Sequence, residues 1–231
     1  MRSLGFRAPI AVIPAGFDFA ARSAAAGRDP ASGPWPELEG RPFILYLARL
    51  HPNKGVELLL EAWRHVQAAH PDVVLLLVGT GEPGYVARLH RLADDAGLAD
   101  RCVWKGFVSE DEKSWAFAHA RFYCLPSFTE NFGNTVQEAL GHGTPVLTTD
   151  ATPWLELPAL GCGWIAACTA AAIGEQLAVA LSLPGDRLRA MGRAGEAHVA
   201  REFSLSSVVQ KQIATYNWLL GGPAPEDLLF P

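Results

Sequence analysis

The feature of this sequence that most restricts its fold is a regular alternation, from Phe43 onward, of short apolar runs with longer amphipathic stretches. In the longer stretches apolar residues recur every three to four positions, as Val56, Leu59, Leu60 and Trp63 do, which predicts helices with one buried face. We expect a short strand at 10–13 and then strands at 43–47, 73–78, 102–105, 121–125, 145–148 and 163–166. We expect helices at 55–69, 84–96, 110–119 and 134–142, and three more after Ala170, Pro184 and Ser204. Such alternation predicts the α/β class, with a Rossmann-like doubly wound parallel sheet of about six strands covered on both faces.

Composition argues against several classes of protein. The 231 residues, 49% of them hydrophobic, can bury a sizeable core, and the net charge of −5 argues against nucleic acid as a partner. No apolar run approaches the roughly 20 residues that span a bilayer, and the start lacks the layout of a signal peptide. The four cysteines form no Cys-x-x-Cys or Cys/His pattern, which favours buried free thiols over disulfides or a metal site. We therefore expect a cytoplasmic protein, with peripheral association at the inner face of the membrane as an open alternative.

Residues 127–140 predict a loop that runs into a helix opened by Gly133 and Asn134. The apolar positions of this helix fall on one face, which leaves Glu138 pointing away from the core. Glu130, in the loop, is expected to face the same space. The free N–H groups of the helix start carry roughly half a positive charge and can bind an anion. Two acids beside an anion site suit a ligand that is anionic in one part and rich in hydroxyls in another, as a sugar nucleotide is.

Two cations, Arg49 and Lys54, follow the first predicted long strand. If the strands take the Rossmann order 3-2-1-4-5-6, the first and fourth are neighbours where the winding reverses, and ligands bind outside their carboxyl ends. The loop with the two cations and the loop with Glu130 then meet in one crevice. Taken alone, Arg49 and Lys54 would be solvated loop residues and Glu138 a solvated helix acid, but the shared crevice favours a binding role.

Several stretches match the motifs of one enzyme family. Residues 130–133 read Glu-Asn-Phe-Gly, and Glu138 follows after a seven-residue gap. Residues 48–55 read Ala-Arg-Leu-His-Pro-Asn-Lys-Gly, and Gly-Thr-Pro-Val follows at 143–146. These stretches resemble the Glu-x7-Glu motif and the Gly-Arg-x-x-x-x-Lys-Gly phosphate loop of the retaining glycosyltransferases of family 4, with Ala48 in place of a glycine. The resemblance covers nearly all of residues 10–220 and implies one half of a GT-B architecture, the C-terminal, donor-binding domain.

The resemblance implies roles for the motif residues. Arg49 and Lys54 would hold the donor diphosphate and stabilise the leaving group, and Glu130 would contact the sugar hydroxyls, so these three are the expected catalytic residues. Glu138 would accept hydrogen bonds from both ribose hydroxyls. The other residues expected to bind the donor nucleotide are Phe132, Gly133, Asn134, Thr135, Gly79, Phe107 and Val108. No metal or other cofactor is implied, because the two cations neutralise the diphosphate and the chain has no Asp-x-Asp.

The resemblance also implies a domain organisation. Residues 13–18, Ile-Pro-Ala-Gly-Phe-Asp, match the segment where a GT-B chain passes from its first domain to its second. We expect 1–19 to be a remnant of this crossing, 20–42 a surface connection and 43–231 the donor-binding domain. The N-terminal acceptor domain would be absent, and the chain alone inactive. The full enzyme would transfer a sugar, with retention, from a UDP-, GDP- or ADP-sugar to a glycan or lipid-linked acceptor in polysaccharide or lipopolysaccharide synthesis.

Three other functions stay open. Residues 79–84 spell Gly-x-Gly-x-x-Gly after an apolar strand, which is the pattern of a Rossmann module that binds a nicotinamide dinucleotide. Such a site needs an acid at the end of the next strand, and that strand ends in Trp104 and Lys105. The sugar-nucleotide 2-epimerases share the GT-B fold, although the pattern from Glu130 to Glu138 disfavours them. The third alternative is that the chain is one half of a larger protein that binds a nucleotide-sugar and has no activity of its own.

Overall fold

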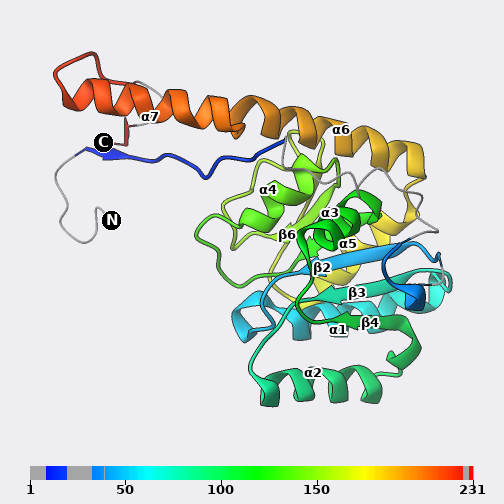
Figure 1. Ribbon diagram of the computed structural model, residues 1–231. Coiled ribbons are helices and arrows are strands. Elements are labelled where there is room, and N and C mark those ends of the chain that lie inside the picture. Colours follow the sequence, from blue (N-terminus) through cyan, green and yellow to red (C-terminus); the bar gives the residue numbers. More distant parts are fainter. Residues whose placement is uncertain (1–8, 20–32, 39, 226–228, 231) are drawn as a thin grey trace.

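The computed structural model describes residues 9–19, 33–38, 40–225 and 229–230 (Figure 1). Its centre is a six-stranded parallel sheet in the order β4-β3-β2-β5-β6-β7. The strands are β2 (Phe43–Leu47), β3 (Val74–Val78), β4 (Cys102–Lys105), β5 (Phe122–Leu125), β6 (Val146–Thr149) and β7 (Gly163–Ala166). Numbered along the chain, this order is 3-2-1-4-5-6, which confirms the predicted doubly wound sheet and makes β2 and β5 neighbours.

Helices cover both faces of the sheet (Figure 1). One layer holds α1 (Val56–Val66), α2 (Pro83–Asp95) and α5 (Ala170–Ser182), and the other holds α3 (Glu110–His119), α4 (Asn134–Gly141) and α6 (Gly185–Glu202). α7 (Leu205–Leu219) continues from α6 and extends beyond the sheet (Figure 1). All the predicted helices occur, and the expected helix over 55–69 finishes as a short 3₁₀ helix, η6 (Gln67–Ala69).

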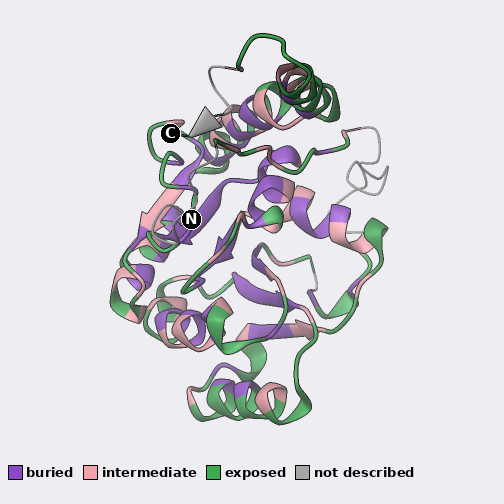
Figure 2. Ribbon diagram, turned by 90° about the vertical axis from the view of Figure 1, so that its left-hand side faces the viewer, coloured by how far each residue is buried: buried purple, intermediate pink, exposed green. Residues whose placement is uncertain are grey.

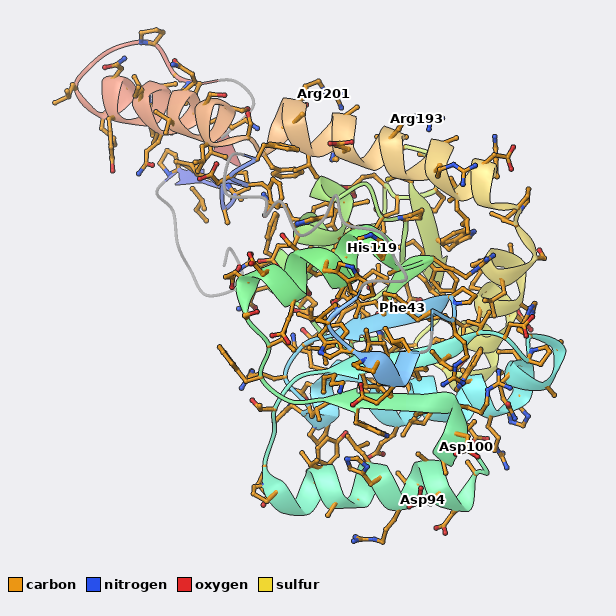
Figure 3. All side chains as sticks on the ribbon, turned by 45° about the vertical axis from the view of Figure 1, so that its right-hand side comes forward. Phe43, Asp94, Asp100, His119, Arg193 and Arg201 are labelled. Atoms are coloured by element: carbon orange, nitrogen blue, oxygen red, sulfur yellow. The ribbon has the colours of Figure 1, made fainter. Side chains whose placement is uncertain are left out.

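The central strands are consecutive apolar runs because both of their faces are covered. β3 and β5 are buried along their whole length, and Figure 2 shows the buried residues concentrated on the sheet and on the inner sides of the helices. α1 and α5 pack against each other where Gly174 faces Ala62, and an added Cβ at Gly174 would make an ordinary contact, 3.8 Å from the Ala62 carbonyl oxygen. In Figure 3 the labelled Phe43 lies in the interior, whereas Arg193 and Arg201 of α6 point away from the sheet.

The connection that precedes the sheet is only partly on the surface. Residues 20–32, like residues 1–8, lie outside the described residues. Trp35 and Leu38 are buried, and the Trp35 ring meets the Trp115 ring of α3 edge to face, with 5.7 Å between centroids. The expectation of a surface connection over 20–42 is therefore wrong for this part. A stretch without periodicity still contributes a large aromatic side chain that closes the core over α3.

Residues 9–19 cross the junction between α6 and α7. The Phe17 N–H donates to the Phe203 carbonyl at 2.6 Å, and the Leu205 N–H donates to the Phe17 carbonyl at 3.2 Å. β1 (Ile10–Ala11) is shorter than the expected strand and pairs antiparallel with β8 (Leu229–Phe230), a strand that the sequence did not predict. Across the described segments, no helix is both long enough and apolar enough to cross a bilayer.

The cysteines are free thiols, as the sequence predicted. Cys102, Cys124 and Cys162 are buried, and Cys168 is half-buried. Burial raises the pKa of Cys102 to about 12 and, with Glu156 nearby, that of Cys162 to about 11. These two thiols are therefore protonated and unreactive near neutral pH.

Candidate functional site

The two loops expected to form the site are packed directly against each other at the carboxyl ends of β2 and β5. The loop after β2 contains a 3₁₀ helix, η5 (Pro52–Lys54), and turns at Gly55, whose φ is +68°. A Cβ at Gly55 would lie only 1.9 Å from the Pro126 carbonyl oxygen, so glycine alone allows this approach. The Phe128 N–H also donates to the Asn53 carbonyl at 2.9 Å. The topology thus brings together the two loops that the sequence placed in one crevice.

Between these loops is a hollow of about 370 Å³. Its lining consists of Ala48, Arg49, Lys54, Glu130, Asn131, Phe132, Gly133, Asn134 and Thr135. α4 begins here at Asn134, after Gly133 in the left-handed region with φ of +83°, and no side chain caps it. The first N–H groups of α4 are therefore available to an anion at the edge of the hollow.

Lys54 and Glu130 form an ion pair inside this hollow. The Lys54 Nζ lies 2.5 Å from the Glu130 Oε1, and the two side chains are 19% and 8% exposed. The same Oε1 accepts a hydrogen bond from the Ser127 hydroxyl at 2.7 Å. Ser127 is fully buried, and its carbonyl accepts from the Thr149 hydroxyl of β6. The carboxylate of Glu130 is therefore fixed in position from two sides, while Arg49 remains exposed at the rim.

Two buried tyrosines tie the loops to the sheet. The Tyr46 hydroxyl donates to the Arg49 carbonyl at 3.0 Å. The Tyr123 hydroxyl donates to the Leu47 carbonyl at 3.0 Å, and its oxygen lies 2.7 Å from the Thr135 Oγ1, whose own proton can complete the second hydrogen bond. Burial raises the pKa of both tyrosines far above the ordinary value, so both remain neutral donors.

Glu138 lies in a second hollow, of about 240 Å³, which shares Asn134 with the first. Its Oε1 is 3.4 Å from the Lys113 Nζ of α3, and this ammonium also pairs with Glu110 at 2.7 Å. Burial raises the pKa of Glu138, and the charge of Lys113 opposes that rise. Burial lowers the pKa of Lys113, but Glu110 and Glu138 outweigh it and keep that pKa above its ordinary value. Lys113 therefore favours the ionised form of Glu138.

Three of the expected nucleotide-binding residues lie outside both hollows. Gly79 directly follows β3 and lies against the loop after β2. An added Cβ there would lie 1.9 Å from the Ala48 carbonyl oxygen, so the close packing of the two segments requires a residue without a side chain. Phe107 follows β4 and is 91% exposed, and Val108 beside it is half-buried. These two residues are placed at the carboxyl edge of the sheet without lining either hollow.

In the Gly-x-Gly-x-x-Gly stretch, the N–H groups that a dinucleotide would need already bind a carboxylate of this chain. The Glu82 carboxylate accepts the N–H groups of Gly84 and Tyr85 at 2.9 and 2.8 Å, and these bonds lower the pKa of Glu82. Pro83, at the first position of α2, has no N–H to offer. The start of α2 is thus capped by a carboxylate where a dinucleotide would need free donors for its phosphates.

Sequence reasoning missed Ser127, Lys113 and Gln137. Ser127 is next to Pro126 in the motif loop, and a hydroxyl three residues before an acid could have suggested a local hydrogen bond. Lys113 follows three acids on α3 and looks like a solvated residue, so nothing local indicates its contact with Glu138. The buried Gln137 amide donates to the Ala15 carbonyl at 2.9 Å, which ties α4 to residues 9–19. No group of three or more His, Cys, Asp or Glu in the described residues could hold a metal ion.

Comparison with protein families gives one match over most of the chain. The sequence model of the family described as glycosyl transferases group 1 matches residues 28–198. The chain is 30% identical over 189 residues to the D-inositol 3-phosphate glycosyltransferase of Segniliparus rotundus, an alignment that covers 78% of this chain and 41% of that protein. It is 32% identical over 190 residues to the lipopolysaccharide core biosynthesis mannosyltransferase LpcC of Rhizobium leguminosarum bv. viciae, over 80% of this chain and 53% of that protein. The chain spans about half the length of these relatives.

Solved glycosyltransferases share the fold. HepE of Anabaena in complex with UDP-glucose superposes with a TM-score of 0.77 at 22% identity, over 90% of this chain and 57% of that one. The C-terminal domain of a group 1 glycosyl transferase, LpcC, from Francisella tularensis superposes with a TM-score of 0.68 at 19% identity, over 82% of this chain and 100% of that one. The α/β fold is therefore that of one half of the GT-B glycosyltransferases.

Proposed function

Because the chain belongs to the group 1 glycosyltransferases, we propose that it is the donor-binding, C-terminal half of a retaining enzyme of family 4. The observation that carries the proposal is the hollow of about 370 Å³ in which Arg49, Lys54, Glu130 and the uncapped start of α4 converge. This set combines positive charge, free N–H donors and a fixed carboxylate. A ligand with a diphosphate next to a polyhydroxylated ring matches that combination.

The diphosphate is assigned to the first hollow. Lys54 and Arg49 supply the positive charge, and the N–H groups of Asn134 and Thr135 stand at the α4 start. As the bond between the sugar and the nucleotide breaks, negative charge grows on the diphosphate, and donors fixed before the reaction stabilise it. The bound metal that other enzymes use for this purpose is not required by this arrangement.

The ribose is assigned to Glu138 in the second hollow. One helical turn separates it from Asn134, which is about 6 Å along the axis at roughly 1.5 Å per residue. That spacing suits a ribose attached to a diphosphate held at the helix start. A carboxylate can accept hydrogen bonds from two neighbouring hydroxyls at once, and the charge of Lys113 favours the ionised form of Glu138.

The sugar is assigned to Glu130. Its Oε1 already accepts from Lys54 and Ser127, which leaves Oε2 for a donor hydroxyl. We give Glu130 an orienting role rather than that of a nucleophile. Phe107 and Val108, at the end of β4, are assigned to the base because they lie at the same edge of the sheet. We assign no ligand contact to Gly79, whose position is explained by packing.

Donor and acceptor are proposed at the level of class. The solved HepE complexes contain UDP or UDP-glucose, and a relative from Corynebacterium glutamicum, 33% identical over 174 residues, is GDP-mannose-dependent. We propose a nucleotide-sugar donor for this chain. The acceptor, a glycan or a lipid-linked sugar, would bind the N-terminal acceptor domain of the full enzyme. That enzyme would work at or near the inner face of the membrane. Residues 1–19 would belong to that interdomain crossing.

A thermal-shift panel of UDP, GDP, ADP and NAD, each with and without EDTA, tests the proposal. A ligand at about 100 times its dissociation constant adds roughly 2.7 kcal/mol of stability, which is easily measured. We expect one nucleoside diphosphate to stabilise the chain regardless of EDTA, and NAD to have no effect because Glu82 caps α2. Stabilisation by NAD alone would support the nicotinamide alternative, and binding that EDTA abolishes would contradict the charge argument.

A further inference from the structure

The ion pair between Lys54 and Glu130 lies where the donor diphosphate is expected to bind. Both side chains line the hollow of about 370 Å³, with 2.5 Å between the Lys54 Nζ and the Glu130 Oε1. At 19% and 8% exposure these charges are poorly screened by solvent. Lys54 therefore already has a negative partner in the absence of any ligand.

The pair is held in place by the surrounding structure. Ser127 is fully buried, donates to the same Glu130 oxygen at 2.7 Å and is itself held by the Thr149 hydroxyl. On the other side, Gly55 and its tight approach to Pro126 fix the end of η5 beside Lys54. The Glu130 carboxylate cannot move away from Lys54 without losing its hydrogen bond from Ser127. Ser127 is thus a positioning residue that keeps the carboxylate of Glu130 next to Lys54.

We propose that Glu130 competes with the diphosphate for Lys54, and that this competition makes the site prefer a nucleotide-sugar to the nucleoside diphosphate product. The inference rests on the proposed function. A nucleoside diphosphate must share the Lys54 ammonium with a fixed carboxylate and gains nothing from Glu130 in return. A nucleotide-sugar meets the same competitor but also offers hydroxyls to the free Oε2. Loss of the sugar therefore weakens the hold on the nucleotide that remains, and the product leaves more readily.

Calorimetry on a charge-neutral variant tests this competition. In Glu130→Gln the amide oxygen can still accept from Ser127, but the negative charge is gone. We expect UDP or GDP, whichever binds the wild-type chain, to bind this variant about tenfold more tightly, while UDP-glucose or GDP-mannose gains less. Glu61→Gln makes the same change of net charge on the exposed face of α1, where Glu61 pairs with Arg64 and His65, and should alter either affinity less than twofold.

A second background shows whether the effect passes through Lys54. If Glu130 acts by occupying Lys54, the gain from Glu130→Gln should be clearly smaller when Lys54 is replaced by Met, because only the direct repulsion between Glu130 and the diphosphate is then relieved. Unchanged or weaker diphosphate binding in a folded Glu130→Gln variant overturns the inference, as does an equal gain with and without Lys54. Glu130→Ala removes the same charge without introducing an amide, so it shows whether an effect is specific to the glutamine side chain. Unfolding temperatures measured for all variants confirm that each is folded. A wild-type chain that binds no nucleoside diphosphate overturns the proposed function and this inference with it.

Discussion

Replacement of Gly55 by alanine probes the contact that joins the two site loops. Gly55 has a φ of +68°, and an added Cβ would lie 1.9 Å from the Pro126 carbonyl oxygen and 2.9 Å from the carbonyl carbon. The left-handed conformation costs a non-glycine residue roughly 1–2 kcal/mol. Overpacking against backbone adds about 1–3 kcal/mol, because a carbonyl cannot rotate away as the end of a side chain can. We therefore expect a loss of about 2–5 kcal/mol in the free energy of unfolding.

Gly97 provides a matched control for this substitution. Its φ is +70°, but nothing lies within 4 Å of an added Cβ, so Gly97→Ala carries the conformational cost alone. A chain of this size loses about 2–4 °C of Tm for each kcal/mol, which predicts a fall of about 4–20 °C for Gly55→Ala and 2–8 °C for Gly97→Ala. Calorimetric melting curves measure both. Equal falls in Tm would refute the close packing of the loops.

The same substitution should also weaken ligand binding. A Cβ at Gly55 must push the loop after β2 away from Pro126, and Lys54 precedes Gly55 directly. Displacement by about 1 Å moves the ammonium out of its ion pair with Glu130 and away from the expected diphosphate position. Isothermal titration of UDP or GDP below the melting temperature should show a clear loss of affinity for Gly55→Ala and none for Gly97→Ala.

Three further predictions concern individual side chains of the site. Glu138→Ala should weaken nucleoside diphosphate binding about 10- to 100-fold, the loss expected for hydrogen bonds to a charged group at roughly 1.5–3 kcal/mol, and calorimetry on the folded variant measures it. Lys113→Met should shift the pH dependence of that binding. Glu138 loses its charge as the pH falls through its raised pKa, and without the Lys113 ammonium this pKa rises further, so affinity should be lost at a higher pH than in the wild-type chain. Calorimetric titrations at several pH values measure the shift. Lys54→Ala should weaken UDP or GDP binding far more than uridine or guanosine binding, because its attraction acts on phosphate; equal losses would place Lys54 outside the phosphate site.

The sheet could be predicted from the sequence because its information is local. A continuous apolar run such as 74–78, followed by an amphipathic stretch, already implies a buried parallel strand and a covering helix. Once the strands are parallel, their carboxyl ends share one edge, which is enough to bring Arg49, Lys54 and Glu130 together. The ordering of six strands then follows from a known winding rule rather than from any single residue.

The contacts that refine the site could not be predicted, because they depend on how elements pack. Lys113 sits on α3 among acids, and only the packing of α3 against α4 brings its ammonium within 3.4 Å of Glu138. Trp35 stands in a stretch without periodicity, yet it closes the core against Trp115. The Gly-x-Gly-x-x-Gly pattern was ambiguous because the sequence shows only the glycines. The position of the Glu82 side chain is what shows that the start of α2 is already capped.

One cluster of aromatic side chains links the site to both segments that leave the sheet. The Phe203 ring, at the junction of α6 and α7, lies 5.7 Å from the Phe132 ring and 5.6 Å from the Trp154 ring. The Trp154 Nε1–H donates to the Phe132 carbonyl at 2.5 Å, and the Phe203 carbonyl accepts from the Phe17 N–H. Because Phe132 is two residues after Glu130, the loop that carries this acid rests on the point where residues 9–19 and α7 meet. Phe203 therefore packs residues 9–19 against the loop that carries Glu130, and Phe203 cannot shift relative to the sheet unless Phe132 repacks.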